Sequence, residues 1–173
     1  MILKGARVKN NQWPEDATCL HDQAGLHRAL DRLAEEITSA LTGDDPLLVL
    51  TVMNGGLVTA GQLLTRLPMP LETDYVHATR YGLETEGSEL RWLHRPDTSL
   101  KGRRVLIVDD ILDRGLTLKA LVERAREEGV RSVHTVALVQ KELPEPAAIE
   151  ADFVGLTVPV SYTHLTLPTI CSV

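Results

Sequence analysis

The chain is poor in aromatic side chains, in cysteine and in long apolar runs. Only 3% of its 173 residues are Phe, Trp or Tyr, so a folded core must consist mainly of aliphatic side chains, which make up most of the 43% hydrophobic residues. Two cysteines, Cys19 and Cys171, are too few for a disulfide framework. No apolar run approaches membrane-spanning length, and no secretory signal opens the chain. We therefore expect a cytoplasmic protein that does not bind membranes.

The chain also lacks an excess of positive charge. Its formal net charge is −6 at pH 7, which argues against general nucleic-acid affinity. Its six histidines are scattered without the spacing of metal ligands, so a structural zinc site has little support. The length fits one domain with a substantial core. The charge of any anionic substrate must then be met by a few local groups.

Apolar spacing along the chain alternates between strand-like runs and helical periodicity. Helical spacing is typical of three segments, at residues 26–41, 57–67 and 118–128. Short apolar runs predict strands at residues 47–52, 71–78, 105–108 and 132–139, with residues 89–94 as a return partner for the second. Strands that alternate with helices form parallel sheets with right-handed crossovers. The sequence therefore predicts an α/β fold.

One segment, residues 105–117, carries most of the chemical information. An apolar run, Val105 to Val108, is followed by an acid pair, a polar loop and the start of a helical pattern, which contain Asp109, Asp110, Asp113, Arg114, Gly115, Leu116 and Thr117. Such a loop opens into the ligand crevice of a parallel sheet, and the amino terminus of the next helix favours a phosphate. Carboxylates accept hydrogen bonds from sugar hydroxyls and bind magnesium. A P-loop would need a lysine after its last glycine, so the segment instead predicts a sugar-phosphate site.

This segment resembles the phosphoribosyl-pyrophosphate signature of type I phosphoribosyltransferases. Over residues 17–159 the chain is most similar to the hypoxanthine-guanine phosphoribosyltransferases within that family. The resemblance implies a parallel-sheet fold with flanking helices and a small hood. It also implies purine salvage, in which hypoxanthine or guanine reacts with phosphoribosyl pyrophosphate to give IMP or GMP and pyrophosphate. Mg²⁺ is the implied cofactor, and a homodimer or homotetramer the implied assembly.

The resemblance assigns roles within the segment. The donor, phosphoribosyl pyrophosphate, is bound by Asp109, Asp110, Asp113, Arg114, Gly115, Leu116 and Thr117. Asp109 and Asp110 face the ribose and the metal. Asp113 is the candidate general base beside purine N7. Arg114 stands where relatives commonly carry threonine or serine, and we expect its backbone N–H to serve in the same way.

Other segments gain implied roles from the same resemblance. Asn54, Gly55 and Gly56 correspond to the pyrophosphate loop, with a cis bond between Met53 and Asn54, although many relatives carry lysine where Asn54 stands. Taken alone, this Gly-Gly sequence is an ordinary turn. Residues 77–92 resemble a mobile lid that includes Arg80, Tyr81 and Gly82, and the rival interpretation is a loose hairpin tip.

The purine site is assigned to two further places. Lys141 would donate to the exocyclic oxygen at purine C6 and so select hypoxanthine and guanine over adenine. Phe153 would stack on the purine, and the backbone at Val154 would contact its edge. The rival interpretations are a solvated strand end for Lys141 and a buried core position for Phe153.

The resemblance stops after Pro159. From Val160 onward the sequence resembles the translation of a transposon sequencing adapter. We therefore interpret residues 1–159 as the phosphoribosyltransferase domain with its C-terminal part truncated, and residues 160–173 as a non-native tail; the alternative is a divergent terminal strand. Relatives usually carry an aspartate for a second magnesium where Val160 stands, so we expect this chain to have impaired activity.

Two other functions share features with this pattern. A regulator that keeps the phosphoribosyltransferase fold but binds RNA to control pyrimidine genes would need a basic face, which the net charge does not favour. A signalling receiver domain also has an acid pair after a strand. Receivers carry that pair after their first strand, whereas Asp109 and Asp110 come late in this chain.

Overall fold

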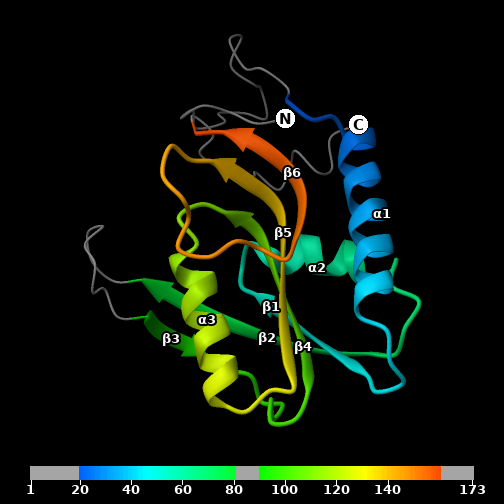
Figure 1. Ribbon diagram of the computed structural model, residues 1–173, viewed down its shortest axis with the longest axis vertical. Coiled ribbons are helices and arrows are strands. Elements are labelled where there is room, and N and C mark those ends of the chain that lie inside the picture. The colour runs from blue at the N-terminus through cyan, green and yellow to red at the C-terminus, as the bar shows by residue number, and fades with distance from the viewer. Residues whose placement is uncertain (1–19, 81–89, 161–173) are drawn as a thin grey trace, which may run out of the picture.

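The computed structural model describes residues 20–80 and 90–160 (Figure 1). The described elements, in chain order, are α1 (Gln23–Ala40), β1 (Leu47–Val52), α2 (Gly56–Leu64), β2 (Leu71–Arg80), β3 (Leu90–His94), β4 (Arg104–Leu112), α3 (Leu116–Glu127), β5 (Ser132–Glu142) and β6 (Phe153–Pro159). The strands form a six-stranded sheet in the order β3-β2-β1-β4-β5-β6. All neighbouring strands are parallel except β2 and β3, which are antiparallel. The predicted α/β fold is confirmed.

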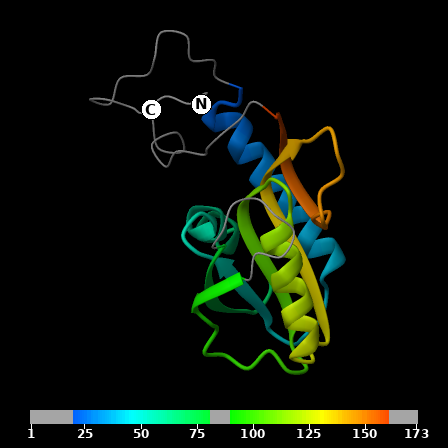
Figure 2. The same ribbon diagram turned by 90° about the vertical axis from the view of Figure 1, so that its left-hand side faces the viewer.

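Helices cover both faces of the sheet and give the molecule three layers. Helices α1 and α2 lie on one face and α3 on the other, as the two views show together (Figures 1 and 2). Alternate residues of β4 point to opposite layers: Leu106 and Val108 pack in the α1 and α2 layer, and Val105 and Ile107 in the α3 layer. Such strands, buried on both faces, explain the continuous apolar runs in the sequence.

Local sequence accounts for where the helices begin and end. Asp22 caps α1, because its Oδ1 accepts a hydrogen bond of 2.7 Å from the Gly25 amide. The buried side of α1 includes Leu26, Leu30, Leu33 and Ile37, which confirms the helical spacing. After α3, Gly129 adopts a left-handed conformation with φ of 78°. No helix in the described part of the chain is both long and apolar enough to cross a membrane.

The strands extend further than the apolar runs predict. Strand β4 continues to Leu112, which is paired with Gln140, so the acid pair lies within the strand and not in the loop after it. Strand β5 likewise continues to Glu142, and β6 was not predicted as a strand. Backbone pairing does not depend on side-chain polarity, so a strand can continue past the point where its side chains leave the core. The prediction ended β4 four residues too early.

Candidate active site

The residues predicted to bind the donor and the pyrophosphate gather, together with Lys141, at the carboxyl ends of the parallel strands. Asp109 and Asp110 lie near the end of β4, and Lys141 lies near the end of β5, directly after Gln140, the partner of Leu112. Two connections open at this edge of the sheet. We call residues 53–56, which connect β1 to α2 and include the first residue of that helix, the pyrophosphate turn, and residues 113–115, between β4 and α3, the phosphate loop. Because carboxyl ends of parallel strands meet at one edge, segments far apart in sequence lie side by side here. We call this edge of the sheet, with its two connections, the crevice.

The acid pair is held in a fixed arrangement that favours a cation. The backbone N–H of Asp110 donates to Oδ1 of Asp109 at 2.9 Å. Burial of the Asp109 carboxyl, followed by the neighbouring charge of Asp110, raises the pKa of Asp109 to about 8. At neutral pH the pair therefore resists carrying two negative charges. A nearby cation would remove that resistance, because it favours the ionised form of both groups.

The pyrophosphate turn fits closely against the acid pair. The Met53–Asn54 peptide bond is cis, as the resemblance implied. A Cβ atom on Gly55 would lie 2.7 Å from Cγ of Asp110, and one on Gly56 would lie 2.6 Å from the carbonyl oxygen of Val108. Both distances are too short for any side chain. The two glycines therefore let the backbone of the turn approach β4 directly.

The phosphate loop leads into α3 through a left-handed residue. Gly115 has φ of 72° and stands at the N-cap of α3, where its lack of a side chain leaves the helix without a side-chain cap. Leu116 and Thr117 then form the first turn of the helix. Amide groups and the dipole at a helix amino terminus attract anions. The predicted donor-binding residues are thus placed as a phosphate cradle requires.

The two residues assigned to base catalysis and purine selection contact each other. Nζ of Lys141 donates to Oδ2 of Asp113 at 2.6 Å. The side chain of Lys141 is only 11% exposed, whereas that of Asp113 is 50% exposed. Lys141 is therefore no solvated strand end, which was the rival interpretation. The contact joins β5 to the phosphate loop and places a cationic donor beside an anionic acceptor.

The connection between β5 and β6 supports the phosphate loop from outside, and sequence reasoning missed it. We call residues 143–152 the β5–β6 connection. The backbone N–H of Ala148 donates to the Arg114 carbonyl at 2.8 Å. A Cβ on Gly115 would lie 3.1 Å from the carbonyl oxygen of Ile149. The only sequence signal of a defined conformation here is the pair Pro144 and Pro146, each with a fixed φ.

The structure corrects the expectation for Phe153. This residue is 8% exposed and packs in the core under α1. It is paired with Val136, whereas Lys141 is paired with Val158, so the two lie about 16 Å apart along the strands at ~3.3 Å per residue. The carbonyl of Val154 accepts a hydrogen bond of 3.3 Å from Arg32 of α1. The core interpretation therefore holds for Phe153, and neither residue is brought to the site.

Part of the predicted site cannot be placed. Tyr81 and Gly82 lie outside the described residues, and of Arg80 only the backbone, at the end of β2, is described. Residues 161–173 of the predicted non-native tail also lie outside them.

The donor set of the crevice suits magnesium completed by a substrate. Within residues 20–80 and 90–160, no three His, Cys, Asp or Glu residues are grouped as a metal site. Magnesium in enzymes is often bound by one or two carboxylates together with substrate phosphates and water. Asp109 and Asp110 supply that minimum. Burial of the Asp109 carboxyl, and then the neighbouring charge of Asp110, raise the pKa of Asp109, and a bound cation would oppose both effects. The residues present therefore fit the metal that the resemblance implies.

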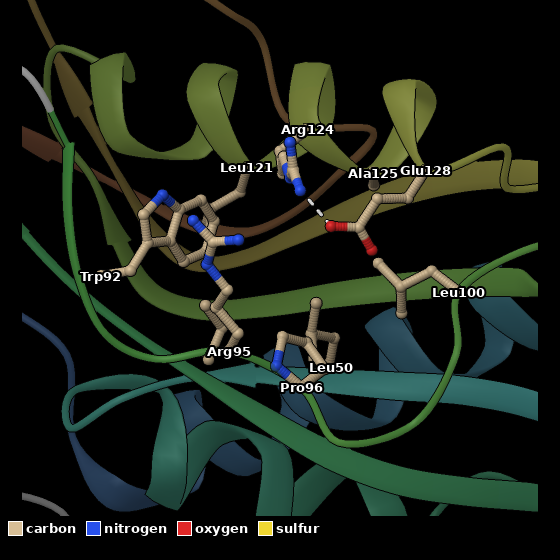
Figure 3. Close-up of a pocket in the computed structure, with 10 residues that line it drawn as sticks. Leu50, Trp92, Arg95, Pro96, Leu100, Leu121, Arg124, Ala125 and Glu128 are labelled. Atoms are coloured by element: carbon tan, nitrogen blue, oxygen red, sulfur yellow. Dashed lines mark hydrogen bonds and ion pairs between the residues drawn. The ribbon is translucent and has the colours of Figure 1, made fainter.

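A separate cavity lies on the α3 face of the sheet (Figure 3). Trp92, Leu50 and Leu121 are among its lining residues, and the Arg124–Glu128 ion pair of 2.8 Å lies at one side. Its volume is about 20 Å³, which has room for about one water molecule. None of the predicted site residues lines it. It is a packing defect under β3 and not a substrate site.

Known proteins of one family are similar to most of this chain. Residues 16–163 match the phosphoribosyl transferase domain family. The chain is 36% identical over 138 residues to the hypoxanthine-guanine phosphoribosyltransferase of Bacillus subtilis, an alignment that covers 79% of this chain and 76% of that protein. It is also 36% identical over 135 residues to the bifunctional protein TilS/HprT of Listeria innocua; the alignment covers 78% of this chain but only 21% of that longer protein.

Solved structures give the same result. The crystal structure of a hypoxanthine phosphoribosyltransferase from Staphylococcus aureus superposes with a TM-score of 0.76 at 28% sequence identity, covering 83% of this chain and 78% of the other. The predicted family and fold are therefore confirmed.

Proposed function

The chain belongs to the phosphoribosyl transferase family, and we propose that it is a purine salvage enzyme that transfers a phosphoribosyl group from phosphoribosyl pyrophosphate to hypoxanthine or guanine. The products are IMP or GMP and pyrophosphate. The observation that carries this proposal is the 2.6 Å contact between Lys141 and Asp113 at the end of the crevice. It offers one donor and one acceptor side by side.

A 6-oxopurine matches this pair along one edge. Its O6 accepts a hydrogen bond, and in the tautomer protonated at N7 the neighbouring N7–H donates one. Lys141 binds O6, and Asp113 accepts the N7 proton as N9 attacks the anomeric carbon of the donor. Adenine presents an amino group where these bases present O6, so it would leave the Lys141 ammonium facing a donor.

The donor is held by the two connections at the same edge of the sheet. The phosphate loop and the first turn of α3, including Leu116 and Thr117, bind the 5′-phosphate through backbone amides. Asp109 and Asp110 accept hydrogen bonds from the ribose hydroxyls. The pyrophosphate turn, with Asn54, Gly55 and Gly56, binds the leaving group through its backbone. Most of the rate acceleration arises because these groups hold the base and the anomeric carbon in line.

Asp109 and Asp110 also would hold magnesium. When it is bound, magnesium neutralises charge on the departing pyrophosphate. The proposal further includes a lid formed by Arg80, Tyr81 and Gly82, a cytoplasmic location, a homodimer or homotetramer, and a non-native tail from Val160 onward.

The test is nucleotide formation. The chain is mixed with phosphoribosyl pyrophosphate, magnesium and either hypoxanthine, guanine or adenine, and products are separated by chromatography. We expect IMP and GMP but not AMP. Because the tail is proposed to impair activity, a chimera that carries the C-terminal segment of the Bacillus subtilis relative from Val160 onward is assayed beside it. If neither protein makes a nucleotide from a 6-oxopurine, the proposal is wrong; AMP as the main product would overturn the role of Lys141.

A further inference from the structure

We propose that the β5–β6 connection is a positioning element for the 5′-phosphate of the donor, and that Ile149 is its positioning residue. The inference rests on the proposed function and adds a residue outside the signature segment. It begins from contacts to three consecutive residues. Asp113 contacts Lys141 at 2.6 Å, Arg114 accepts a hydrogen bond of 2.8 Å from Ala148, and Gly115 abuts Ile149. The end of β5 and the connection that follows it thus hold every residue of the phosphate loop.

The bond from Ala148 sets the direction of one peptide group. A trans peptide is planar, and its C=O and N–H groups point in opposite directions. Because the Arg114 carbonyl points toward Ala148, the N–H of Gly115 points away from the β5–β6 connection. That is the side on which an anion can approach the helix amino terminus. The connection therefore fixes the orientation of an amide that faces the phosphate.

Ile149 limits movement of the loop at the next residue. A Cβ on Gly115 would lie 3.1 Å from the Ile149 carbonyl oxygen, 3.2 Å from its amide nitrogen and 3.2 Å from its Cγ2 atom. Gly115 also has φ of 72°, a left-handed backbone conformation that residues with a side chain rarely adopt. An outward swing of the loop would drive Gly115 into this residue. Ile149 thus sterically limits outward movement of the phosphate loop, and we call it the stop behind that loop.

The stop is itself anchored in the protein core. Ile149 and Ala151 pack against the apolar cluster under α3, which contains Leu118, Leu121 and Val122. The same cluster holds the helix whose amino terminus would bind the phosphate. Ile149 therefore contacts the phosphate loop on one side and the cluster that holds α3 on the other, and so fixes the position of the loop relative to the helix. The pyrophosphate turn is fitted against Asp110 and Val108 instead, so loosening Ile149 should affect one end of the donor and spare the other.

The experiment compares ligands that occupy different ends of the site. Ile149→Ala, Ile149→Val and the unchanged full-length chain are titrated by calorimetry, in the presence of magnesium, with ribose 5-phosphate, pyrophosphate and phosphoribosyl pyrophosphate. Val130→Ala is the matched control, because Val130 is also a partly buried residue packed on the cluster under α3, but it follows the far end of that helix. Thermal unfolding of each variant identifies any general loss of stability.

We expect Ile149→Ala to raise the Kd for ribose 5-phosphate about tenfold, because a misplaced binding group forfeits its orientation. The Kd for pyrophosphate should not change. Ile149→Val, which keeps a branched Cβ, should restore binding, and Val130→Ala should leave both affinities unchanged at a similar thermal stability. Equal weakening of both ligands, or unchanged ribose 5-phosphate binding, would overturn the inference. If neither the unchanged chain nor the chimera with the Bacillus subtilis C-terminal segment binds either ligand or forms a nucleotide, the proposed function itself fails.

Discussion

The pyrophosphate turn and the phosphate loop solve similar problems in different ways. Both follow a buried parallel strand, both precede a helix, and both contain a glycine whose neighbours would have to move to accommodate an added Cβ atom. The pyrophosphate turn is packed inward, with Gly55 against Asp110 and Gly56 against the Val108 carbonyl. The phosphate loop is braced outward, against Ile149 of the β5–β6 connection.

The difference shows how one fold can hold two proposed anion sites with different supports: one is packed against the central strand, and the other rests on a connection remote in sequence. A turn packed against β4 is held in place by the centre of the sheet, where the acid pair lies. A loop braced by a connection depends on a segment remote in sequence. The first arrangement suits a leaving group that must stay beside the acids, and the second suits a phosphate that must be held at a distance from them. Each can be disturbed separately, in the following order of expected effect.

The largest expected effect is on kcat, and it should separate Asp113, a proposed general base, from Asn54, whose side chain has no proposed catalytic role. Asp113→Asn in the phosphate loop removes the proton acceptor and should lower kcat about a hundredfold, within the range of general base catalysis. Binding of phosphoribosyl pyrophosphate should persist, because the backbone amides remain. Asn54→Ala in the pyrophosphate turn should change kcat little, since that turn acts through its backbone. Steady-state kinetics with hypoxanthine measure kcat for both variants. A comparable fall in kcat in the two would contradict the proposed difference between the Asp113 and Asn54 side chains.

The next test asks how tightly the pyrophosphate turn is packed. Gly56→Ala places a Cβ 2.6 Å from the Val108 carbonyl oxygen and should lower the free energy of unfolding by about 2–3 kcal/mol. Gly61→Ala is the control in the same helix, where a Cβ meets nothing within 4 Å. That change should stabilise the protein by about 0.5–1 kcal/mol, because alanine favours helix more than glycine does. Urea denaturation gives both values; a neutral Gly56→Ala would mean that the turn is not packed inward.

A smaller effect isolates the brace behind the phosphate loop. Gly115 and Gly102 both have φ of 72°, but only Gly115 has neighbours within 4 Å of an added Cβ. Alanine at either position should cost about 1 kcal/mol for the left-handed backbone. At Gly115 the contact with Ile149 should add roughly 1 kcal/mol. The free energies of unfolding of the two variants are compared by urea denaturation. An equal loss of stability would show that Ile149 moves aside at little cost.

The smallest effect lies away from both connections, on β2. Burial raises the pKa of the Asp74 carboxyl, but hydrogen bonds from the backbone amides of Thr98 and Tyr75 outweigh it and hold the pKa below its usual value. A lowered pKa adds stability above the unfolded value of 3.8, and this stability is lost as pH falls through the folded value. Asp74→Asn should therefore flatten the acid side of a stability curve measured from pH 6 to pH 3. The affinity of Asp74→Asn for phosphoribosyl pyrophosphate should stay the same. A changed affinity would mean that Asp74 on β2 influences the crevice.

Sequence reasoning succeeded where side-chain pattern and backbone geometry coincide. The apolar runs of β1 and β4 and the spacing of α1 report burial directly, and Asp109 to Thr117 form a continuous segment with its own signature. The limits of β4 were missed because polar, half-buried residues interrupt its apolar run after Val108, while pairing continues to the buried Leu112. Strand β6 was missed because glycine and threonine interrupt its apolar pattern.

Contacts between distant segments could not be predicted in the same way. The resemblance assigned Phe153 to stacking on the purine, but its register with Val136 places it in the core. Ile149 carries no chemical group that marks it, and it gains a role only because the β5–β6 connection returns to Gly115. Register and return paths are properties of the assembled sheet, so local composition contains little information about them.

The ion pair between Lys141 and Asp113 also bears on the choice of inhibitors. The pair carries no net charge, so an uncharged heterocycle can take its place between the two groups and leave the electrostatic balance of the crevice intact. A ligand with an acidic substituent at that edge would compete with Asp113 for the ammonium and leave one carboxylate exposed to repulsion. Compounds designed for this enzyme should therefore present a neutral face to β5 and confine their negative charge to the ends that reach the two anion-binding connections.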